Sequence, residues 1–427
     1  MDPIEHLFRR ESGRMVASVT RIFGVHNLAL AEDVVQDAFC RALEVWKVRG
    51  VPENPSAWLM ATAKHRALDV LRRERTGRTF APELSRLIES EWTIASTVKE
   101  AFSPEAIKDD QLRMMFSCCH PRLREEVQVA LILHILCGFS VDEIASAFLS
   151  GHAMIEKRVT RGKKVLASSK KLFDLASDDF SARLSAVHRA LYLLFNEGYH
   201  GASPESAVRG ELCQEAIRLT RMLLEHPFGA TPASYALTAL MCLHAARLPA
   251  RTDAAGDLLS LFDQDRSRWD RGLADEGCCM LELAATGPVL SDYHVEAMIA
   301  AIHTRAPNTE DTDWAGIVHL YDVLMTLRPS PVVALNRAIA IAQLEGGESG
   351  LKAIGAIADP HRLAAYPFYW AALGELALRQ GDRQNARGHF RAALVRARNP
   401  MERRFLEQRI EACENGSGAP RVSFPRS

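Results

Sequence analysis

Helical periodicity runs through most of the chain and constrains its fold more than any other feature. Apolar residues recur at intervals of three and four, as they do on one face of an α-helix, and no alternating β pattern of useful length is found. The sequence therefore predicts an all-α fold. With 427 residues, 48% of them hydrophobic and 25% charged, the chain is long enough for roughly two to four domains with separate cores.

Changes in composition predict where these domains lie. Residues 1–76 form a first helical bundle, and 77–110 form a polar, acid-leaning linker with some local helix. A second compact helical block covers 111–171. Residues 180–414 are rich in Ala and Leu and form a long helical extension, and the tail 415–427 is expected to be disordered.

Neither export nor a membrane span is expected. The start "MDPIEHLFRR" has no apolar core behind a basic region, and the longest apolar run, "VALILHILCGF", is short and contains His134. Nine cysteines in such a chain fit reduced thiols in the cytoplasm. Cys118 and Cys119 are adjacent and lack the two-residue spacer of a zinc knuckle, so no metal or cofactor is predicted.

A local positive field stands out because the formal net charge of the chain is only -1. Between Lys157 and Lys171 there are seven basic residues and no acid. Since the whole protein has no strong field, attraction to a polyanion has to come from local patches such as this one. The alternative is a solvated helix face without a partner.

The neighbourhood of this basic run predicts a helix-turn-helix. Ser140 and Glu143 form a capping box before a short helix with the apolar residues Ile144, Ala147 and Phe148. A turn, "SGH", precedes a second helix, and residues 124–137 supply a hydrophobic support helix. The apolar stripe of the second helix is Ile155, Val159, Gly162 and Leu166, and its basic residues are Lys157, Arg158, Arg161, Lys163 and Lys164. This pattern is typical of a recognition helix for the major groove.

Two further helices are predicted in the first block. The segment "LALAEDVVQDAFCRALEVW" is amphipathic, with apolar residues that include Val34, Ala38, Leu43 and Trp46. Its residues available to a partner are Asp33, Gln36, Asp37 and Arg41. The segment "PSAWLMATAKHRALDVLRRER" has a stripe formed by Leu59, Ala63, Ala67, Val70 and Leu71, and six basic residues lie between Lys64 and Arg78.

Taken in order, these strings resemble the extracytoplasmic-function (ECF) sigma factor family, the small bacterial promoter-recognition subunits of RNA polymerase. The resemblance covers residues 5–170, from "AEDVVQDAFCRALEVW" and "NPSAWLMATAKHRALDVLRR" to "EEVQVALILHILCGFSVDEIASAF" and "EKRVTRGKKVL". It implies sigma region 2 over 1–76 and sigma region 4 over 111–171, and a function that is not enzymatic. The flexible linker is expected to let the two regions reach separated promoter elements.

The resemblance also implies partners, namely promoter DNA and core RNA polymerase, through the clamp coiled coil of its largest subunit and its flap region. Residues implied to bind the polymerase are Asp33, Gln36, Asp37 and Arg41. Those implied at the -10 element are Asn54, Trp58, Lys64, His65, Arg66, Arg72 and Arg73, although Trp58 could equally be a core residue. Those implied at the -35 element are His152, Met154, Lys157, Arg158, Arg161, Lys163 and Lys164, in a turn, "SGHAM", that departs from the family's usual one.

The extension carries tetratricopeptide-like (TPR-like) spacing near 331–400. Its signature residues are Trp370, Leu373, Gly374, Gly381, Ala386, Phe390, Ala393 and Pro400. With the first two blocks, it resembles a subgroup of these sigma factors in which such an extension influences activity in place of an anti-sigma factor. A protein or small-molecule regulator of the extension is therefore a possible partner.

Two alternatives stay open at this stage. A stand-alone helix-turn-helix regulator with an effector-binding helical domain would explain the second block, although it would not need the "DVVQD" helix. The strings "LYLLFNEGYHGAS" and "FDQDRSRWD" could line a polar pocket through Glu197, His200, Asp263, Asp265, Arg266 and Arg268. Caps and ion pairs around helix ends are the preferred interpretation of these residues, and no catalytic role is predicted.

Overall fold

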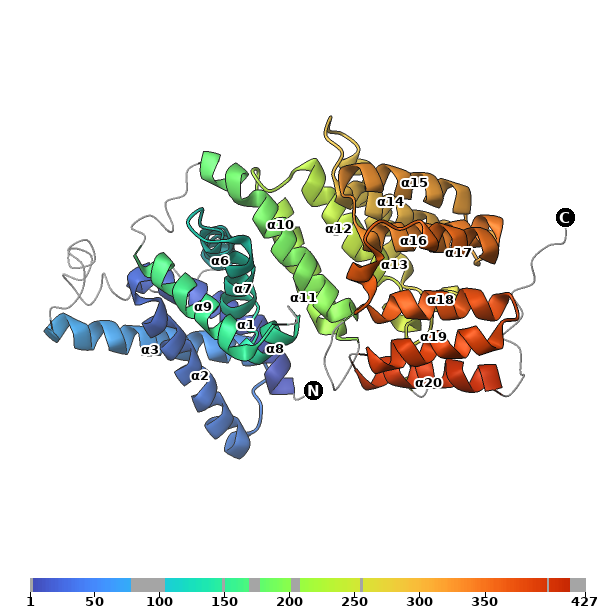
Figure 1. Ribbon diagram of the computed structural model, residues 1–427. Helices are drawn as coiled ribbons and strands as arrows, with labels where there is room; N and C mark the ends of the chain where they lie inside the picture. Colours follow the sequence, from blue (N-terminus) through green and yellow to red (C-terminus); the bar gives the residue numbers. More distant parts are fainter. Residues whose placement is uncertain are drawn as a thin grey trace. The chain divides into compact units, whose positions relative to one another are not determined.

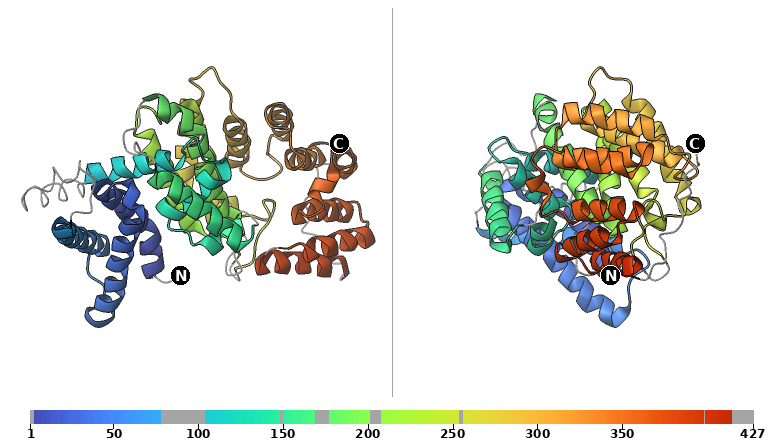
Figure 2. Two further views of the ribbon diagram at one scale, coloured as in Figure 1. Left: turned by 60° about the vertical axis from the view of Figure 1, so that its left-hand side comes forward. Right: turned by 45° about the vertical axis from the view of Figure 1, so that its right-hand side comes forward.

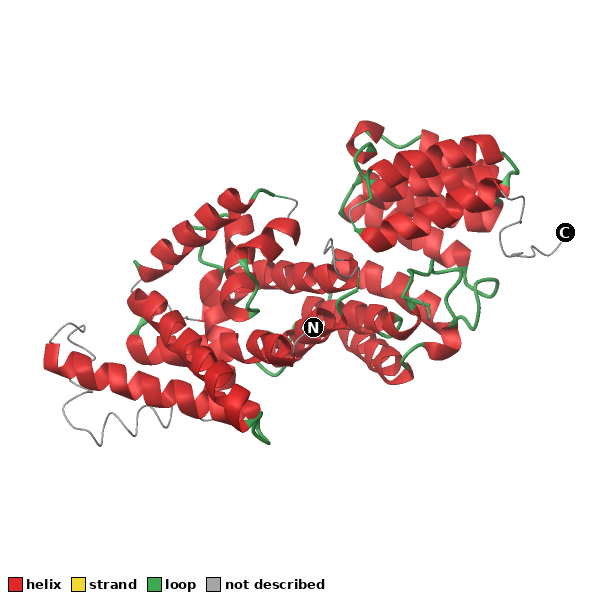
Figure 3. Cartoon of the chain, turned by 90° about the horizontal axis from the view of Figure 1, so that it is seen from below, coloured by secondary structure: helices red, strands yellow, loops and turns green. Residues whose placement is uncertain are grey.

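The computed structural model describes residues 3–77, 104–147, 150–168, 177–200, 208–253, 256–397 and 399–414 (Figure 1). Within these ranges every regular element is helical, and the only bridge of the β type joins Thr252 and Leu258 (Figure 3). The all-α fold predicted from the sequence is confirmed. The predicted tail and most of the predicted linker lie outside the described residues.

The chain divides into two compact units. The first contains residues 1–194 and 225–229, and the second contains 195–224 and 230–427. The boundary lies within α10 (Ser177–His200), and not at the position near 180 that composition predicts.

The first unit is built from nine further helical elements among the described residues. They are α1 (Pro3–Phe23), η1 (Val25–Asn27), α2 (Leu28–Arg49), α3 (Pro55–Gly77), α6 (Pro104–Cys118), α7 (Glu125–Leu131), η2 (Ile132–Leu136), α8 (Val141–Ala147) and α9 (His152–Ala167).

Helix α1 lies at the centre of this unit. Its residues from Met15 to Thr20 are all buried, so it is covered on more than one face, and it contacts α2, α3, α6 and η2. Gly24 ends it with a φ of 80°, and Gly50 ends α2 with a φ of 79°, backbone conformations that favour glycine. α3 buries Leu59, Ala63 and Ala67, spaced by four residues, which fixes the face it turns to the core.

Helix α6 begins at Pro104, inside the segment predicted as linker. Asp110, placed by the sequence analysis in that linker, is completely buried, and one of its carboxylate oxygens lies 2.9 Å from Nη1 of Arg21 on α1. An acidic residue is buried here because it is paired, which a composition-based boundary cannot detect.

The second unit contains the longer run of helices. Besides the end of α10, these are α11 (Gly210–Leu224), α12 (Pro232–Ala245), α13 (Arg271–Ala284), α14 (Asp292–Arg305), α15 (Trp314–Leu327), α16 (Pro331–Glu345), α17 (Gly347–Gly355), α18 (Pro367–Arg379), α19 (Arg383–Val395) and α20 (Pro400–Glu414). Three short 3-10 turns also occur between these helices among the described residues: η3 (Leu248–Ala250), η4 (Arg266–Arg268) and η5 (Pro360–Leu363).

The last helices of this unit form antiparallel pairs. α16 packs on α17, α18 on α19, and α19 on α20, so that α18, α19 and α20 lie side by side (Figures 1 and 2). Gly374 makes the second pair close, because a Cβ there would lie 2.7 Å from the ring of Phe390, which is itself fully buried. Gly381 turns the chain between α18 and α19 with a φ of 81°.

Candidate polymerase and nucleic-acid interface

The outer face of α2 carries the residues predicted to bind the polymerase. Asp33, Gln36, Asp37 and Arg41 are all exposed. The opposite face is buried, and it includes Val34, Ala38 and Trp46 as the periodicity predicts. Leu43 is a correction, because it was predicted on the apolar face and is 50% exposed.

Helix α3 presents its basic residues beside α2. His65, Arg72 and Arg73 are exposed, and Lys64 is half-buried. The guanidinium of Arg66 forms an ion pair with the carboxylate of Asp37 on α2. A residue predicted to contact DNA and one predicted to contact the polymerase are therefore partners of each other in this arrangement.

Trp58 and Asn54 stand at the start of α3. The Trp58 ring packs edge-on against Trp46, with ring centroids 5.4 Å apart, and it is only half-buried. Asn54 caps the helix, since its Oδ1 accepts a hydrogen bond from the Ala57 backbone N–H at 3.0 Å. Trp58 thus joins the core on one side and leaves part of its surface open.

The capping box predicted before α8 is present. The Ser140 backbone N–H and hydroxyl donate to Oε2 of Glu143, both at 2.9 Å, and the Glu143 N–H donates back to the Ser140 hydroxyl at 3.2 Å. Ile144 is buried as predicted, whereas the side chain of Ala147 and the whole of Phe148 lie outside the described residues.

Helix α9 buries the predicted stripe and exposes a basic face. Its buried residues are Ile155, Val159, Gly162 and Leu166. Gly162 permits close packing on α7, because a Cβ there would meet the side chain of Leu131 at 2.7 Å. The exposed residues of the predicted DNA surface are His152, Met154, Lys157, Arg161 and Lys164, and Arg158 is half-buried.

Lys163 departs from that prediction. Its Nζ lies 2.8 Å from the carboxylate of Glu32 on α2 and 3.1 Å from Nε2 of His134, and its side chain is only 27% exposed. The helical spacing places Lys163 beside the exposed basic face, but its rotation about the axis brings it to the edge that packs inside the unit. Lys163 is an internal ion-pair partner here.

His134 completes this polar cluster from η2, a single turn of π-helix. Its Nδ1 lies 2.9 Å from the backbone oxygen of Phe139. Burial lowers the pKa of His134, and the neighbouring positive charge of Lys163 lowers it further. Sequence reasoning missed Glu32 and His134, because nothing in their local patterns signals a contact between elements that are far apart in the chain.

The segments predicted as two separate blocks are packed together in the first unit. Beyond the Glu32–Lys163 pair, α1 contacts both α6 and η2. At Gly13 the approach is so close that a Cβ would lie 2.0 Å from the backbone oxygen of Leu136. The expectation of two readers joined only by a flexible linker therefore does not describe this arrangement.

The comparison with known proteins assigns the family. The chain is 38% identical over 388 residues to "Uncharacterized protein R00370" of Rhizobium meliloti (strain 1021), and the match covers 90% of each chain. The present chain belongs to the same family as that protein. No solved structure matches it.

Two segments of this family member also match described sequence families. Residues 7–76 match sigma-70 region 2, and residues 183–285 match a family of unknown function, DUF6596. The first match confirms the sequence-based assignment of region 2.

More distant relatives are sigma factors. The chain is 22% identical over 169 residues to "Probable ECF RNA polymerase sigma factor SigI" of Mycobacterium tuberculosis, covering 40% of this chain and 56% of that one. It is 22% identical over 144 residues to "ECF RNA polymerase sigma factor SigX" of Bacillus subtilis, covering 33% and 71%. Together with the region 2 match, these relatives support a sigma factor.

The polar residues of the two strings in the second unit have structural partners. Glu197 pairs with Arg209 at 3.1 Å in a buried setting, and Asp265 caps η4 through the Ser267 N–H at 2.9 Å. Arg266 donates to the backbone oxygens of His303 and Ala306 at 2.9 and 2.7 Å. The interpretation as caps and ion pairs agrees with these contacts. Asp263 and His200 also line a cavity.

Neither a membrane-spanning helix nor a metal-binding cluster is found among the described residues. No helix there is long and apolar enough to cross a membrane. In the same ranges, no group of three or more His, Cys, Asp and Glu side chains is arranged to hold a metal ion. Burial raises the pKa of the Cys119 thiol to about 12, so this cysteine is held as the neutral thiol.

Proposed function

We propose that this protein is a sigma factor of the ECF type, which binds core RNA polymerase, recognises -35 and -10 promoter elements and directs transcription initiation. The observation that carries the proposal is the sigma-70 region 2 match over residues 7–76, which includes the α2 and α3 surfaces described above. The expected place of action is the cytoplasm, and no enzymatic step is part of the proposal.

The exposed face of α2 is the proposed polymerase surface. Asp33, Gln36 and Arg41 are exposed side chains of mixed charge on a helix that is firmly packed on its other face. Such a rigid face suits docking on a charged coiled coil, since little side-chain or backbone order has to be gained on binding. Asp37 belongs to this surface as well. To bind the polymerase, Asp37 would have to leave its exposed partner Arg66, which costs little because a surface ion pair contributes little stability.

Helix α3 is the proposed reader of the -10 element. Capturing an unpaired base needs an aromatic wall and cations for the phosphates, because strand opening costs a few kcal/mol that stacking and charge have to offset. The half-buried Trp58 supplies an aromatic surface, and the exposed Arg72 and Arg73 supply charge further along the same helix. Asn54, Lys64, His65 and Arg66 are proposed to take part on the same side.

Helices α8 and α9 are proposed to act as a helix-turn-helix at the -35 element. Lys157, Arg161 and Lys164 form an exposed basic face, with His152 and Met154 at its start. Side chains at the beginning of a recognition helix usually reach base edges, whereas basic residues along it contact phosphates. Lys163 would join them only after leaving Glu32, so the proposal includes an opening of the contact between α9 and α2.

The second unit is proposed to regulate this activity as a TPR-like domain. Support comes from its paired helices between residues 331 and 414 and from the close Gly374–Phe390 contact at signature positions. Stacked helix pairs form concave surfaces that bind other molecules, which suits regulation by a protein or a small molecule.

The test is reconstitution of the full chain with core RNA polymerase on a promoter library. The expected result is initiation at specific promoters. The double variant Gln36→Ala with Asp37→Ala should weaken polymerase binding by roughly 10-fold or more, as loss of a central interface contact does. The matched control is Glu44→Ala, which removes another exposed acid from α2 and should leave polymerase binding within about two-fold.

The result can also reject the proposal. Promoter-independent transcription, or no transcription by a correctly folded chain, would refute it. Specific binding to a duplex without any binding to the polymerase would favour a stand-alone regulator.

A further inference from the structure

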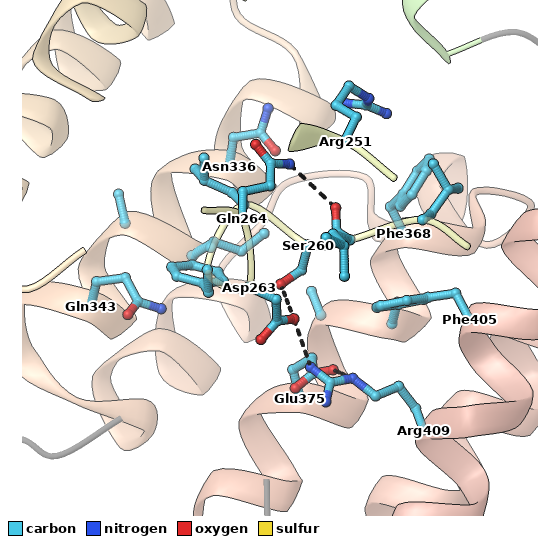
Figure 4. Close-up of a pocket in the computed structure, with 18 of the residues that line it drawn as sticks. Arg251, Ser260, Asp263, Gln264, Asn336, Gln343, Phe368, Glu375, Phe405 and Arg409 are labelled. Carbon is cyan, nitrogen blue, oxygen red and sulfur yellow. Dashed lines mark hydrogen bonds and ion pairs between the residues drawn. The ribbon is translucent and has the colours of Figure 1, made fainter. Parts of the chain in front are cut away.

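A cavity of about 470 Å³ lies entirely within the second unit. Figure 4 shows the residues around it: the segment that carries Ser260, Asp263 and Gln264 crosses it, Asn336 and Gln343 face it from α16, and Phe405 and Arg409 face it from α20. Its volume falls in the range of small-molecule sites, which are mostly apolar with a few placed polar groups.

The walls of the cavity are mainly aliphatic and aromatic. Ile339 and Ala340 of α16, Phe368 of α18 and Phe405 of α20 contribute apolar surface, and Trp314 lies on the α15 side. Two amide side chains border this surface from α16, two turns apart: Asn336 and Gln343. Neither amide has a hydrogen-bond partner among the described residues. The cavity can therefore accept an apolar body and a few hydrogen bonds.

The charges on the α20 side are compensated. Nε of Arg409 lies 2.6 Å from the Glu375 carboxylate and Nη2 lies 4.0 Å from Asp263. Arg404 pairs with Asp257 at 2.8 Å. These acids and bases pair with one another, so none of them is left with an uncompensated charge for a ligand.

Two arginines elsewhere on the lining have no acidic partner among the described residues. The guanidinium of Arg251 lies over the Tyr199 ring at 4.1 Å, and its buried Nε has no hydrogen-bond partner. Arg247 lies 5.5 Å from the Trp269 ring centroid, and its Nε donates only to the Gln264 amide, at 3.4 Å. Aromatic faces and an amide stabilise these cations without cancelling their charge.

The histidines near these arginines add no further positive charge. Burial, together with the positive charge of Arg247, lowers the pKa of both His244 and His303 to about 3. Both rings are therefore neutral at ordinary pH. Arg247 and Arg251 are half-buried. Two partly desolvated cations without a counter-charge are costly for a fold, and a bound anion would offset that cost.

We propose that this cavity binds a small organic anion with an apolar body, and that its acid group is held by Arg247 and Arg251. A carboxylate or sulfonate can accept two parallel N–H hydrogen bonds from a guanidinium. Such charge-assisted, bidentate hydrogen bonds are stronger than hydrogen bonds between neutral groups. The two strings that region 2 and the basic helix leave unexplained both contribute, through Tyr199 and through Gln264 and Trp269. The ligand site stands or falls independently of the proposed sigma-factor activity.

The test uses two fluorescent probes that share one apolar skeleton. Anilinonaphthalene sulfonate carries an acid group, and phenylnaphthylamine is the same skeleton without it. Both are titrated into the full-length protein. The expected result is sulfonate binding that is roughly 10-fold tighter than binding of the neutral probe, as one charge-assisted contact provides.

Two variants connect this difference to the cavity. Arg251→Gln should weaken sulfonate binding by roughly 10-fold and leave binding of the neutral probe within about two-fold. Arg362→Gln removes an exposed arginine of the same unit that does not line the cavity, and it should change neither. Equal weakening of both probes by Arg251→Gln, or equal affinity of the two probes for the unaltered protein, would overturn the proposal.

A competition experiment on the unaltered protein covers the case in which Arg251→Gln does not fold. Decanoate should displace the sulfonate probe at a lower concentration than decanol does, because only decanoate has an acid group for the arginines. Displacement by decanol at the same or a lower concentration would also overturn the proposal.

Discussion

The contact between α1 and η2 at Gly13 leads to a prediction whose sign is unusual. In an open helix, Gly→Ala is stabilising by about 0.5–1 kcal/mol, because alanine loses less backbone freedom on folding. At Gly13 a Cβ would lie 2.0 Å from the Leu136 backbone oxygen. Ordinary contacts between carbon and a carbonyl oxygen begin near ~3.3 Å, so the two backbones have to separate by more than ~1 Å.

That separation sets the expected magnitude. Neither partner can yield by rotating a side chain, because the clash is with backbone, and overpacking of this kind costs ~1–3 kcal/mol. Because both partners are backbone, the cost belongs to the upper part of that range, ~2–3 kcal/mol, and after subtraction of a helix-propensity gain of ~1 kcal/mol Gly13→Ala should destabilise the first unit by about 1–2 kcal/mol. For a unit of this size the unfolding temperature should fall by roughly 2–8 °C.

The assay is scanning calorimetry of the full chain, with hydrogen exchange of the peptides that cover α1 and η2. The matched control is Gly388→Ala on α19, where a Cβ would meet nothing within 4 Å and should stabilise its helix. Faster exchange in both α1 and η2 is expected for Gly13→Ala. If Gly13→Ala were as stable as the unaltered chain, or stabilised like the control, the packing of α1 against η2 would not be tight and the reasoning would be refuted.

Three further predictions concern pH, DNA and the second core. Burial lowers the pKa of His244 and His303 to about 3, from an ordinary 6.5, so the stability of the second unit should be fully present above pH 6.5. As the pH falls from 6.5 toward 3, the free energy of unfolding should drop by ~1.4 kcal/mol per pH unit for each histidine. A urea midpoint that does not change over that range would contradict this. Arg161→Ala should reduce the log-log salt slope of duplex binding by about 1, measured by fluorescence anisotropy, from a value near -4 or -5 for ~5 phosphates; an unchanged slope would remove Arg161 from the phosphate contacts. Phe390→Ala should cost ~3–5 kcal/mol in thermal unfolding, since the ring is fully buried, whereas Val395→Ala at an exposed position should stay within about 0.5 kcal/mol; similar losses for both would contradict the packing.

Local patterns were sufficient to predict several parts of the fold and site. The capping box of Ser140 and Glu143 involves residues three positions apart, so their reciprocal hydrogen bonds follow from adjacency in a single turn. The buried stripe of α9 and the exposed Gln36 and Asp37 of α2 follow from the 3.6-residue period in the same way.

Errors arose where the period predicts only an approximate direction. Leu43 lies at the edge of the apolar stripe of α2, and Lys163 lies at the edge of the basic face of α9. A residue at such an edge is buried or exposed according to which helix packs beside it. Its environment therefore depends on a neighbour that is distant in the sequence.

The sequence by itself determined the helical class, the order of the segments and the faces of α2, α3 and α9, because each depends on residues within a few turns of one another. Only the tertiary structure decided that Glu32 and His134 hold Lys163, that α1 meets η2 at Gly13, and that Arg247 and Arg251 line a cavity without an acidic partner of their own among the described residues. These contacts join residues that are separated along the chain. Their free energies depend on distance, burial and the local balance of charge, which exist only once the helices are packed.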